Sequence, residues 1–197
     1  MRICFVGDSF VNGTGDPDCL GWAGRVCAAS QHDGHDVTYY NLGVRRETSA
    51  DIRHRWEREV SCRLPEGSDG RVVFSFGVND TTLEEGKPRV AFSDSIENAR
   101  QILDLARQSY PTLMIGPPPT PDSEQNTRIA RLSDEFALVC GELGVPYLSV
   151  FASLQASGVW AREAVANDGA HPHAGGYSEM AQLVQVWSGW LSWFITK

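Results

Sequence analysis

The sequence lacks a run of apolar residues long enough to cross a lipid bilayer, which takes about 20 residues. Its most apolar stretch, residues 180–197, is interrupted by Gln182, Gln185, Ser188 and Ser192, and it predicts a helix packed on the core. The sequence also lacks a charged start followed by an apolar segment. A secretory signal of the usual kind is therefore not seen, and a cytoplasmic location is expected.

Positive charge is scarce, with 17 Lys and Arg against 25 Asp and Glu and a net charge of −8. A nucleic-acid partner is not expected, because binding to phosphate backbones depends on clustered positive charge. The five cysteines form no C-x-x-C pair and no Cys/His spacing typical of a metal site. We expect reduced, mostly buried thiols, no metal site and no disulfide framework.

Internal repeats and low-complexity tracts are absent, and the length of 197 residues suits one domain spanning residues 1–197. Short apolar runs alternate with longer segments of helical periodicity. This pattern is typical of an α/β protein whose parallel sheet is covered by helices on both faces. The expected strands are residues 3–6, 37–42, 72–76, 113–115 and 146–148, and the expected helices have apolar stripes over residues 96–106, 129–143 and 180–194. A helix is also expected to start at Thr48 after the second strand, because Thr48 can cap it and Asp51 favours its first turn.

Polar residues follow the predicted strands at the point where each strand ends. Gly7-Asp8-Ser9 follows the first strand, Asn41-Leu42-Gly43 closes the second, and Gly77-Val78-Asn79-Asp80 follows the third. A fourth polar cluster, NDGAHPHAGG at residues 167–176, precedes the last predicted helix. Because the carboxyl ends of parallel strands meet at one edge of a sheet, where ligands of such folds bind, these groups are expected to meet there.

Ser9, Asp168 and His171 supply the side chains of a nucleophilic site. A serine becomes nucleophilic when an imidazole takes its proton and a carboxylate orients that imidazole. Asp168 and His171 lie three residues apart, so one turn can hold both. The N–H groups of Ser9 and Gly43 and the side-chain amide of Asn79 are candidate donors to an oxyanion. His173 is the alternative base, but the expectation is that it lies at the surface.

The motifs resemble those of the GDSL-like esterase and lipase family, also called SGNH hydrolases. GDSF at residues 7–10, NLG at 41–43, GVND at 77–80 and DGAHP at 168–172 follow the order of the family's blocks. The G-x-S-x-G elbow of the usual α/β-hydrolases is absent, because Val11 stands at the place of its second glycine. Two departures are Phe10 in place of leucine and Arg46 where many members have a glycine.

The resemblance implies a three-layer α/β/α flavodoxin-like fold with a five-stranded parallel sheet and no cofactor. It also implies Ser9 as nucleophile, His171 as general base, Asp168 as its orienting carboxylate, and Gly43 and Asn79 as oxyanion donors. The predicted function is that of a serine hydrolase that cleaves carboxylic esters of small or short-acyl substrates through an acyl-enzyme on Ser9.

Two alternatives stay open. The same family pattern also serves carbohydrate O-acetylesterases and thioesterases. From a different class, a non-catalytic flavin- or phosphate-binding module would use the hydroxyl-rich loop at residues 9–14. The expected partner is a small-molecule ester. Trp187, Trp190 and Trp193 are expected to lie in the core and on a surface that faces a partner. A contact between copies in a homo-oligomer therefore stays open.

Overall fold

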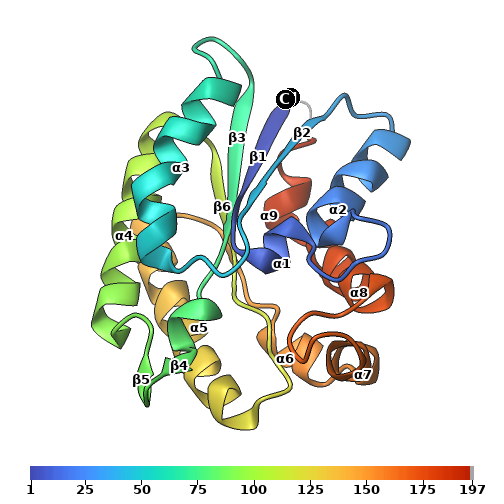
Figure 1. Ribbon diagram of the computed structural model, residues 1–197. Coiled ribbons are helices and arrows are strands. Elements are labelled where there is room, and N and C mark those ends of the chain that lie inside the picture. The colour runs from blue at the N-terminus through green and yellow to red at the C-terminus, as the bar shows by residue number, and fades with distance from the viewer. Residues whose placement is uncertain (196–197) are drawn as a thin grey trace.

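A computed structural model describes residues 1–195. Its main sheet has five parallel strands in the order β2-β1-β3-β6-β7 (Figure 1). These strands are β1 (Arg2–Gly7), β2 (Thr38–Gly43), β3 (Gly70–Ser75), β6 (Thr112–Ile115) and β7 (Tyr147–Leu148). The strand predictions are confirmed with shifts of one or two residues at their ends.

The sheet lies between two layers of helices, with α3, α4 and α5 on one side and α2 and α8 on the other (Figure 1). The longer helices are α2 (Gly21–His32), α3 (Ser49–Arg63), α4 (Phe92–Ser109), α5 (Ser123–Leu143), α7 (Gly158–Ala166) and α8 (Ala174–Gln185). The shorter ones are α1 (Ser9–Asn12), η1 (Asn79–Thr81), α6 (Phe151–Gln155) and α9 (Ser188–Leu191). The predicted three-layer, flavodoxin-like α/β architecture is confirmed.

The chain passes from β1 to one edge of the sheet and then returns to build the other half. β1 therefore has β2 on one side and β3 on the other, and the order of strands reverses there. Gly7 pairs with Gly43 of β2 and with Ser75 of β3, so the three strands end at the same level. In open parallel sheets this is where ligands bind, since helix connections leave a crevice at the switch point.

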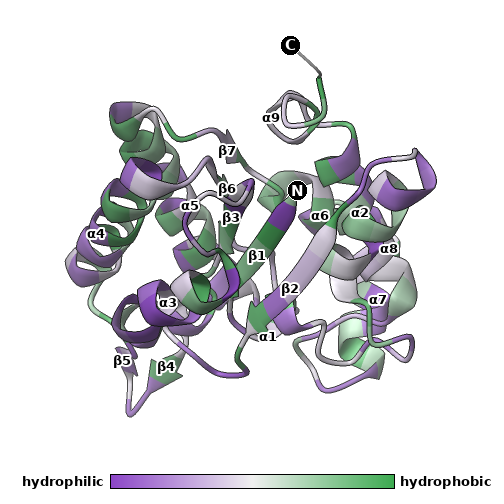
Figure 2. Cartoon of the chain, turned by 90° about the horizontal axis from the view of Figure 1, so that it is seen from above, coloured by the Kyte–Doolittle hydropathy of each residue, from purple (hydrophilic) through white to green (hydrophobic). Residues whose placement is uncertain are grey.

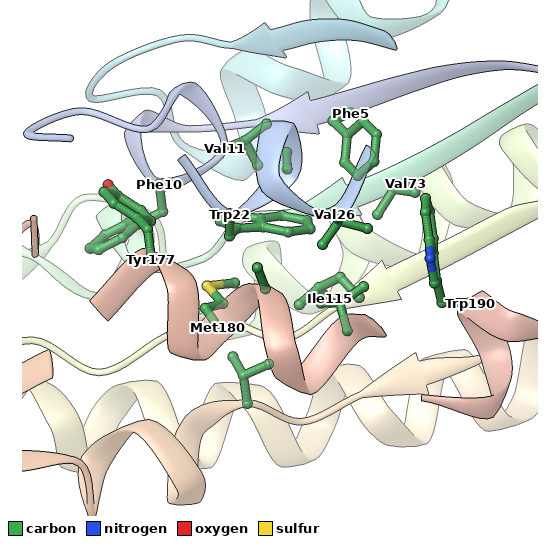
Figure 3. Close-up of a cluster of buried hydrophobic side chains, with 14 of the residues drawn as sticks. Phe5, Phe10, Val11, Trp22, Val26, Val73, Ile115, Tyr177, Met180 and Trp190 are labelled. Atoms are coloured by element: carbon green, nitrogen blue, oxygen red, sulfur yellow. The ribbon is translucent and has the colours of Figure 1, made fainter. Parts of the chain in front are cut away.

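Two hydrophobic clusters fill the spaces between the sheet and the helix layers. One includes Phe5 of β1, Trp22 of α2 and Met180 of α8, which Figure 3 shows packed together beside the sheet. The other joins Trp56 of α3 and Phe136 of α5 to the opposite face of the sheet. Figure 2 shows the resulting hydropathy pattern, with a mostly hydrophobic β1 in the centre and a paler β2 at the edge.

Helix α3 begins at a complete capping box. The Thr48 hydroxyl accepts a hydrogen bond from the Asp51 N–H, and the Asp51 carboxylate accepts one from the Thr48 N–H at 2.9 Å. These bonds satisfy N–H groups that the first turn of a helix leaves without partners. The helix start predicted at Thr48 is therefore confirmed, and the direction in which α3 leaves the sheet edge is set locally.

One predicted helix needs correction, and one hairpin was not predicted. Residues 180–194 do not form one helix, because α8 ends at Gln185 and the chain turns before α9 starts at Ser188. The last two residues of the predicted tail helix, 196–197, lie outside the described residues. The hairpin that was not predicted is formed by β4 (Leu83–Glu84) and β5 (Lys87–Pro88), and its turn has positive φ values at Glu85 and Gly86.

No helix within residues 1–195 is both long and apolar enough to cross a membrane. The cysteines are all free thiols: Cys4, Cys27 and Cys140 are buried, whereas Cys19 and Cys62 are exposed. Burial raises the pKa of the Cys4, Cys27 and Cys140 thiols to about 12, so these three stay protonated and unreactive.

Candidate active site

Ser9 is the first residue of helix α1, directly after β1 ends. Asp8 caps this helix, since its Oδ1 accepts the Phe10 N–H at 2.9 Å. The strand can end here only with a glycine, because a Cβ on Gly7 would lie 1.9 Å from the Ser75 carbonyl oxygen of the neighbouring strand. Ser9 is 3% exposed. The sharp exit after β1 thus holds the hydroxyl at the carboxyl edge of the sheet.

His171 and Asp168 lie on the loop between α7 and α8, and the structure brings them to Ser9. The Ser9 hydroxyl donates to His171 Nε2 at 2.7 Å, and His171 Nδ1–H donates to Asp168 Oδ2 at 2.8 Å. The other Asp168 oxygen accepts the N–H groups of Ala170 at 3.1 Å and His171 at 2.9 Å. One short turn therefore aligns the carboxylate and the imidazole with the hydroxyl.

The environment of His171 favours the neutral imidazole. Burial lowers the pKa of His171 below its ordinary value, and the Asp168 carboxylate opposes this shift only in part. The positive charge of Arg45 lowers the pKa of His171 further. Burial would raise the pKa of Asp168, but hydrogen bonds from His171 and Ala170 outweigh it and leave the pKa below its usual range. Near neutral pH, a neutral imidazole thus faces the hydroxyl and an ionised carboxylate lies behind it.

Phe10 packs on the imidazole of His171, and Asn167 holds the backbone of the same residue. The Phe10 ring centroid lies 4.7 Å from that of His171, and the Asn167 side-chain amide donates to the His171 carbonyl at 3.0 Å. Phe10 in turn stacks on Trp160 at 6.1 Å. The aromatic residue at position 10, a departure from the leucine of the family motif, therefore packs directly on the imidazole.

The predicted oxyanion donors have different surroundings. The Asn79 amide donates one N–H to the Glu47 carbonyl at 2.9 Å and has a second N–H that can serve another acceptor. The Gly43 N–H, in contrast, donates to its neighbour Asn41 Oδ1 at 2.9 Å. The Gly43 N–H thus has an acceptor within the chain, and its role as an oxyanion donor stays a prediction.

The absence of a side chain at Gly43 has a structural reason. A Cβ there would lie 2.2 Å from the Asn12 nitrogen and 2.7 Å from the Asp8 carbonyl oxygen. Gly43 therefore allows β2 to lie directly against the segment that carries Ser9. Close packing is therefore one physical reason for a glycine at this place in the motif.

Two arginines follow Gly43 and differ in what they contact. Arg45, which the sequence analysis missed, places Nη2 3.2 Å from Asp168 Oδ2, the oxygen that also accepts His171 Nδ1–H. Arg46 extends away to Glu84 at 3.5 Å, and its backbone has a φ of 71°. This left-handed conformation suits glycine, which explains the glycine that many family members have at this position.

His173, the alternative base, is engaged elsewhere. Its Nδ1 lies 2.8 Å from the Gly15 carbonyl oxygen, and its N–H donates to Glu163 Oε2 at 3.0 Å. Since a carbonyl oxygen can only accept, Nδ1 carries the proton in this contact. Within residues 1–195, no group of three or more His, Cys, Asp or Glu side chains is placed to bind a metal ion.

A family model for the GDSL-like lipase/acylhydrolase family matches residues 5–178. No significant match was found among curated protein sequences. Among solved structures, the chain resembles a lipase/acylhydrolase from Enterococcus faecalis with a TM-score of 0.77 and 23% identity, covering 93% of each chain. It also resembles Axe2, an acetylxylan esterase from Geobacillus stearothermophilus, with a TM-score of 0.76 and 16% identity over 92% of this chain and 91% of that chain.

A third similar structure is LAE5, an alpha/beta hydrolase enzyme from the metagenome of Lake Arreo, Spain. Its TM-score is 0.78 at 16% identity, with 96% of this chain and 95% of that chain covered. At these identities the structures establish a shared fold, whereas the family match establishes membership because it spans most of the chain. The resemblance seen in the sequence motifs is thus confirmed: the protein belongs to the GDSL-like lipase/acylhydrolase family and is a carboxylic ester hydrolase.

Proposed function

We propose that the protein hydrolyses esters of small or short-acyl substrates through an acyl-enzyme on Ser9. The observation that carries this proposal is the continuous chain of hydrogen bonds from the Ser9 hydroxyl to His171 and from His171 to Asp168, at 2.7 and 2.8 Å. Both distances lie within the reach required of a nucleophile, its base and the orienting group.

In the first half of the proposed reaction, Ser9 Oγ attacks the carbonyl carbon of the ester while its proton passes to His171 Nε2. The imidazolium that forms is stabilised by the Asp168 carboxylate. The carbonyl oxygen becomes an oxyanion, for which the Ser9 N–H and the second N–H of the Asn79 amide are the proposed donors. The tetrahedral intermediate then expels the alcohol, which takes the proton from Nε2 and leaves an acyl group on Ser9.

In the second half, water repeats the attack on the acyl-enzyme. His171 Nε2 takes a proton from water, and the hydroxyl adds to the acyl carbon. Collapse of the second tetrahedral intermediate returns the proton to Ser9 Oγ and releases the carboxylic acid. The lowered pKa of His171 suits this cycle, because the imidazole must be neutral at the start of each half.

A carbohydrate O-acetylesterase is the second candidate. Beside the proposed site lies a pocket of about 580 Å³ lined by polar groups, among them Asn12, Thr14, Asp16, Asn41 and Arg45. Apart from Asp16, whose buried carboxylate is bound to Arg25, these side chains offer amide, hydroxyl and guanidinium groups that match the many hydroxyls of a sugar. The fold is also similar to that of Axe2, which is an acetylxylan esterase.

The testing experiment compares the wild type with Ser9→Ala, His171→Ala and the control His32→Ala, an exposed histidine at the end of α2. Each is assayed on p-nitrophenyl esters from acetate to long acyl chains and on acetylated xylo-oligosaccharides. We expect turnover of acetate to fall by several orders of magnitude in the first two variants and to stay unchanged in the third. Turnover that survives in Ser9→Ala would refute the proposed nucleophile.

The substrate profile separates the two candidates. Faster release of acetate from the sugar than from the aryl ester would favour the carbohydrate esterase. A preference for long acyl chains would contradict both. These comparisons use kcat/KM, because this ratio measures discrimination between substrates.

A further inference from the structure

Arg55 of helix α3 turns its guanidinium inward, toward the carboxyl edge of the sheet. Its side chain is only 16% exposed. Nη2 donates to the carbonyl oxygens of Gly7 at 3.1 Å and Leu42 at 3.0 Å, Nε donates to Glu47 Oε2 at 2.5 Å, and Nη1 donates to Glu59 Oε1 at 3.3 Å. One charged group thus joins three separate segments of the chain to α3.

Two of these segments are the ends of neighbouring strands. Gly7 is the last residue of β1 and lies two positions before Ser9, and Leu42 directly precedes Gly43 at the end of β2. The Gly7 carbonyl also accepts the Val44 N–H at 3.0 Å, so Arg55 binds at the last rung of the β1–β2 ladder. Loss of the guanidinium would remove these two hydrogen bonds at the end of the strand that leads to Ser9.

The third segment links Arg55 to the Asn79 amide. Glu47 lies in the connection from β2 to α3, which runs past the lower end of the sheet in Figure 1. Its carboxylate is held by Arg55, and its carbonyl oxygen accepts the Asn79 amide at 2.9 Å. The Glu47 side chain is 18% exposed, so little water competes for it. The place of the Asn79 amide therefore depends on Glu47, and that of Glu47 depends on Arg55.

We propose that Arg55 is a positioning residue for the oxyanion hole: it sets the distance between the Ser9 N–H and the Asn79 amide without contacting the substrate. This inference rests on the proposed ester hydrolysis at Ser9. Oxyanion donors act only when they are held in place before charge develops, and a displacement of about 1 Å costs about 10²-fold in rate. Arginine suits the role because its planar fork reaches several acceptors at once, whereas lysine offers one compact charge.

The test uses Arg55→Met and Arg55→Lys, with Arg53→Met as the matched control. Arg53 lies on the same helix, but its guanidinium donates to Gln101 on α4 at 2.6 Å and is exposed. Each variant is measured for kcat and KM on p-nitrophenyl acetate and for inhibition by an alkyl boronic acid, which forms a tetrahedral adduct on serine. A fluorophosphonate titration counts the reactive sites.

For Arg55→Met we expect kcat per titrated site to fall about 10- to 100-fold, KM to change less than about twofold, and the boronic acid to bind more weakly by a factor similar to the loss of kcat. Arg55→Lys recovers only part of the loss, and Arg53→Met behaves as wild type. The acid limb of the pH profile stays in place, because Arg55 forms no hydrogen bond with His171 or Asp168.

A double-mutant cycle with Asn79→Ala tests the link through Glu47. If Arg55 acts on the Asn79 amide, its loss costs less in the Asn79→Ala background than in the wild type. Full additivity would refute the route through Asn79. A loss of activity that merely follows the number of titratable sites, with unchanged inhibition by the boronic acid, would show a structural role only.

A replacement variant covers the case in which Arg55→Met does not fold, and Ser9→Ala separates failure of the Arg55 proposal from failure of the proposed function. If Arg55→Met does not fold, Glu47→Gln replaces it, since this change removes the charged partner and keeps the backbone carbonyl that holds Asn79. We expect a smaller loss of kcat than in Arg55→Met, with boronic acid binding weakened by a factor similar to that smaller loss. The proposed function fails if Ser9→Ala retains turnover, whereas the Arg55 proposal alone fails if Ser9→Ala is inactive and the Arg55 variants match the wild type.

Discussion

Replacement of Arg45 by glutamine tests the electrostatics of the candidate site. In the wild type, Nη2 of Arg45 lies 3.2 Å from the Asp168 oxygen that also accepts His171 Nδ1–H. Burial is the main cause that lowers the pKa of His171, and the charge of Arg45 lowers it further. Glutamine removes this charge, so the pKa of His171 is expected to rise and the imidazole to be protonated at a higher pH.

The size of the expected shift in the pKa of His171 depends on how exposed the side chains of Arg45 and Asp168 are. The side chains of Arg45 and Asp168 are 61% and 30% exposed, so solvent screens their interaction. Exposed ion pairs contribute about 0.2–1 kcal/mol. Since one pKa unit corresponds to about 1.4 kcal/mol, the pKa of His171 is expected to rise by about 0.1–0.7 unit in Arg45→Gln.

The assay measures kcat/KM for p-nitrophenyl acetate against pH, because this ratio reports ionisations of the free enzyme. The acid limb is expected to move to higher pH by that amount in Arg45→Gln. Raising the salt concentration moves the wild-type limb in the same direction, since salt screens the Arg45 charge. Arg46→Gln is the control, because Arg46 is exposed and pairs with Glu84 instead. An acid limb that stays in place or moves to lower pH in Arg45→Gln would refute this reasoning.

Three further changes have defined outcomes. Asn79→Ala is expected to lower kcat about 10²- to 10³-fold with little change in KM, as judged by steady-state kinetics, because an oxyanion donor acts only in the transition state; an equal rise in KM would point to ground-state binding instead. Burial raises the pKa of Asp8 from 3.8 to about 7, so the folded state loses stability as the pH rises from 3.8 through about 7 and the carboxyl group must ionise while buried. Asp8→Asn should therefore raise Tm more at pH 8 than at pH 5, and thermal melts at both pH values check this. Thr48→Ala removes one half of the capping box and is expected to lower the free energy of unfolding by about 1 kcal/mol in urea denaturation.

The sequence predicted the fold well where the pattern is local. The apolar runs at the strands and the helical stripes identified the α/β class, because the period of side-chain burial follows directly from backbone geometry. Thr48 and Asp51 predicted the start of α3 by hydrogen bonds within one turn. The end of α8 at Gln185 and the hairpin at residues 83–88 were missed, because an apolar stripe does not reveal a turn and a two-residue strand carries too little pattern.

Only part of the candidate site was predicted, because only some of its contacts depend on spacing along the chain. The pairing of Asp168 with His171 depends on a spacing of three residues, which a sequence displays. The occupation of the Gly43 N–H by Asn41 depends on the rotamer of one side chain, and the contact of Arg45 with Asp168 joins residues 123 positions apart. Neither follows from spacing along the chain.

By itself, the sequence determined which groups are present and which elements carry them: a serine after β1, a histidine and an aspartate in one turn, and an amide after β3. Only the tertiary structure decided how these groups meet, which donors remain free, and that Arg55 joins the ends of β1 and β2 to the support of Asn79. The reason is that a periodic burial pattern is a property of neighbouring residues, whereas the position of a hydrogen-bond donor is set by strands and loops that pack together from distant parts of the chain.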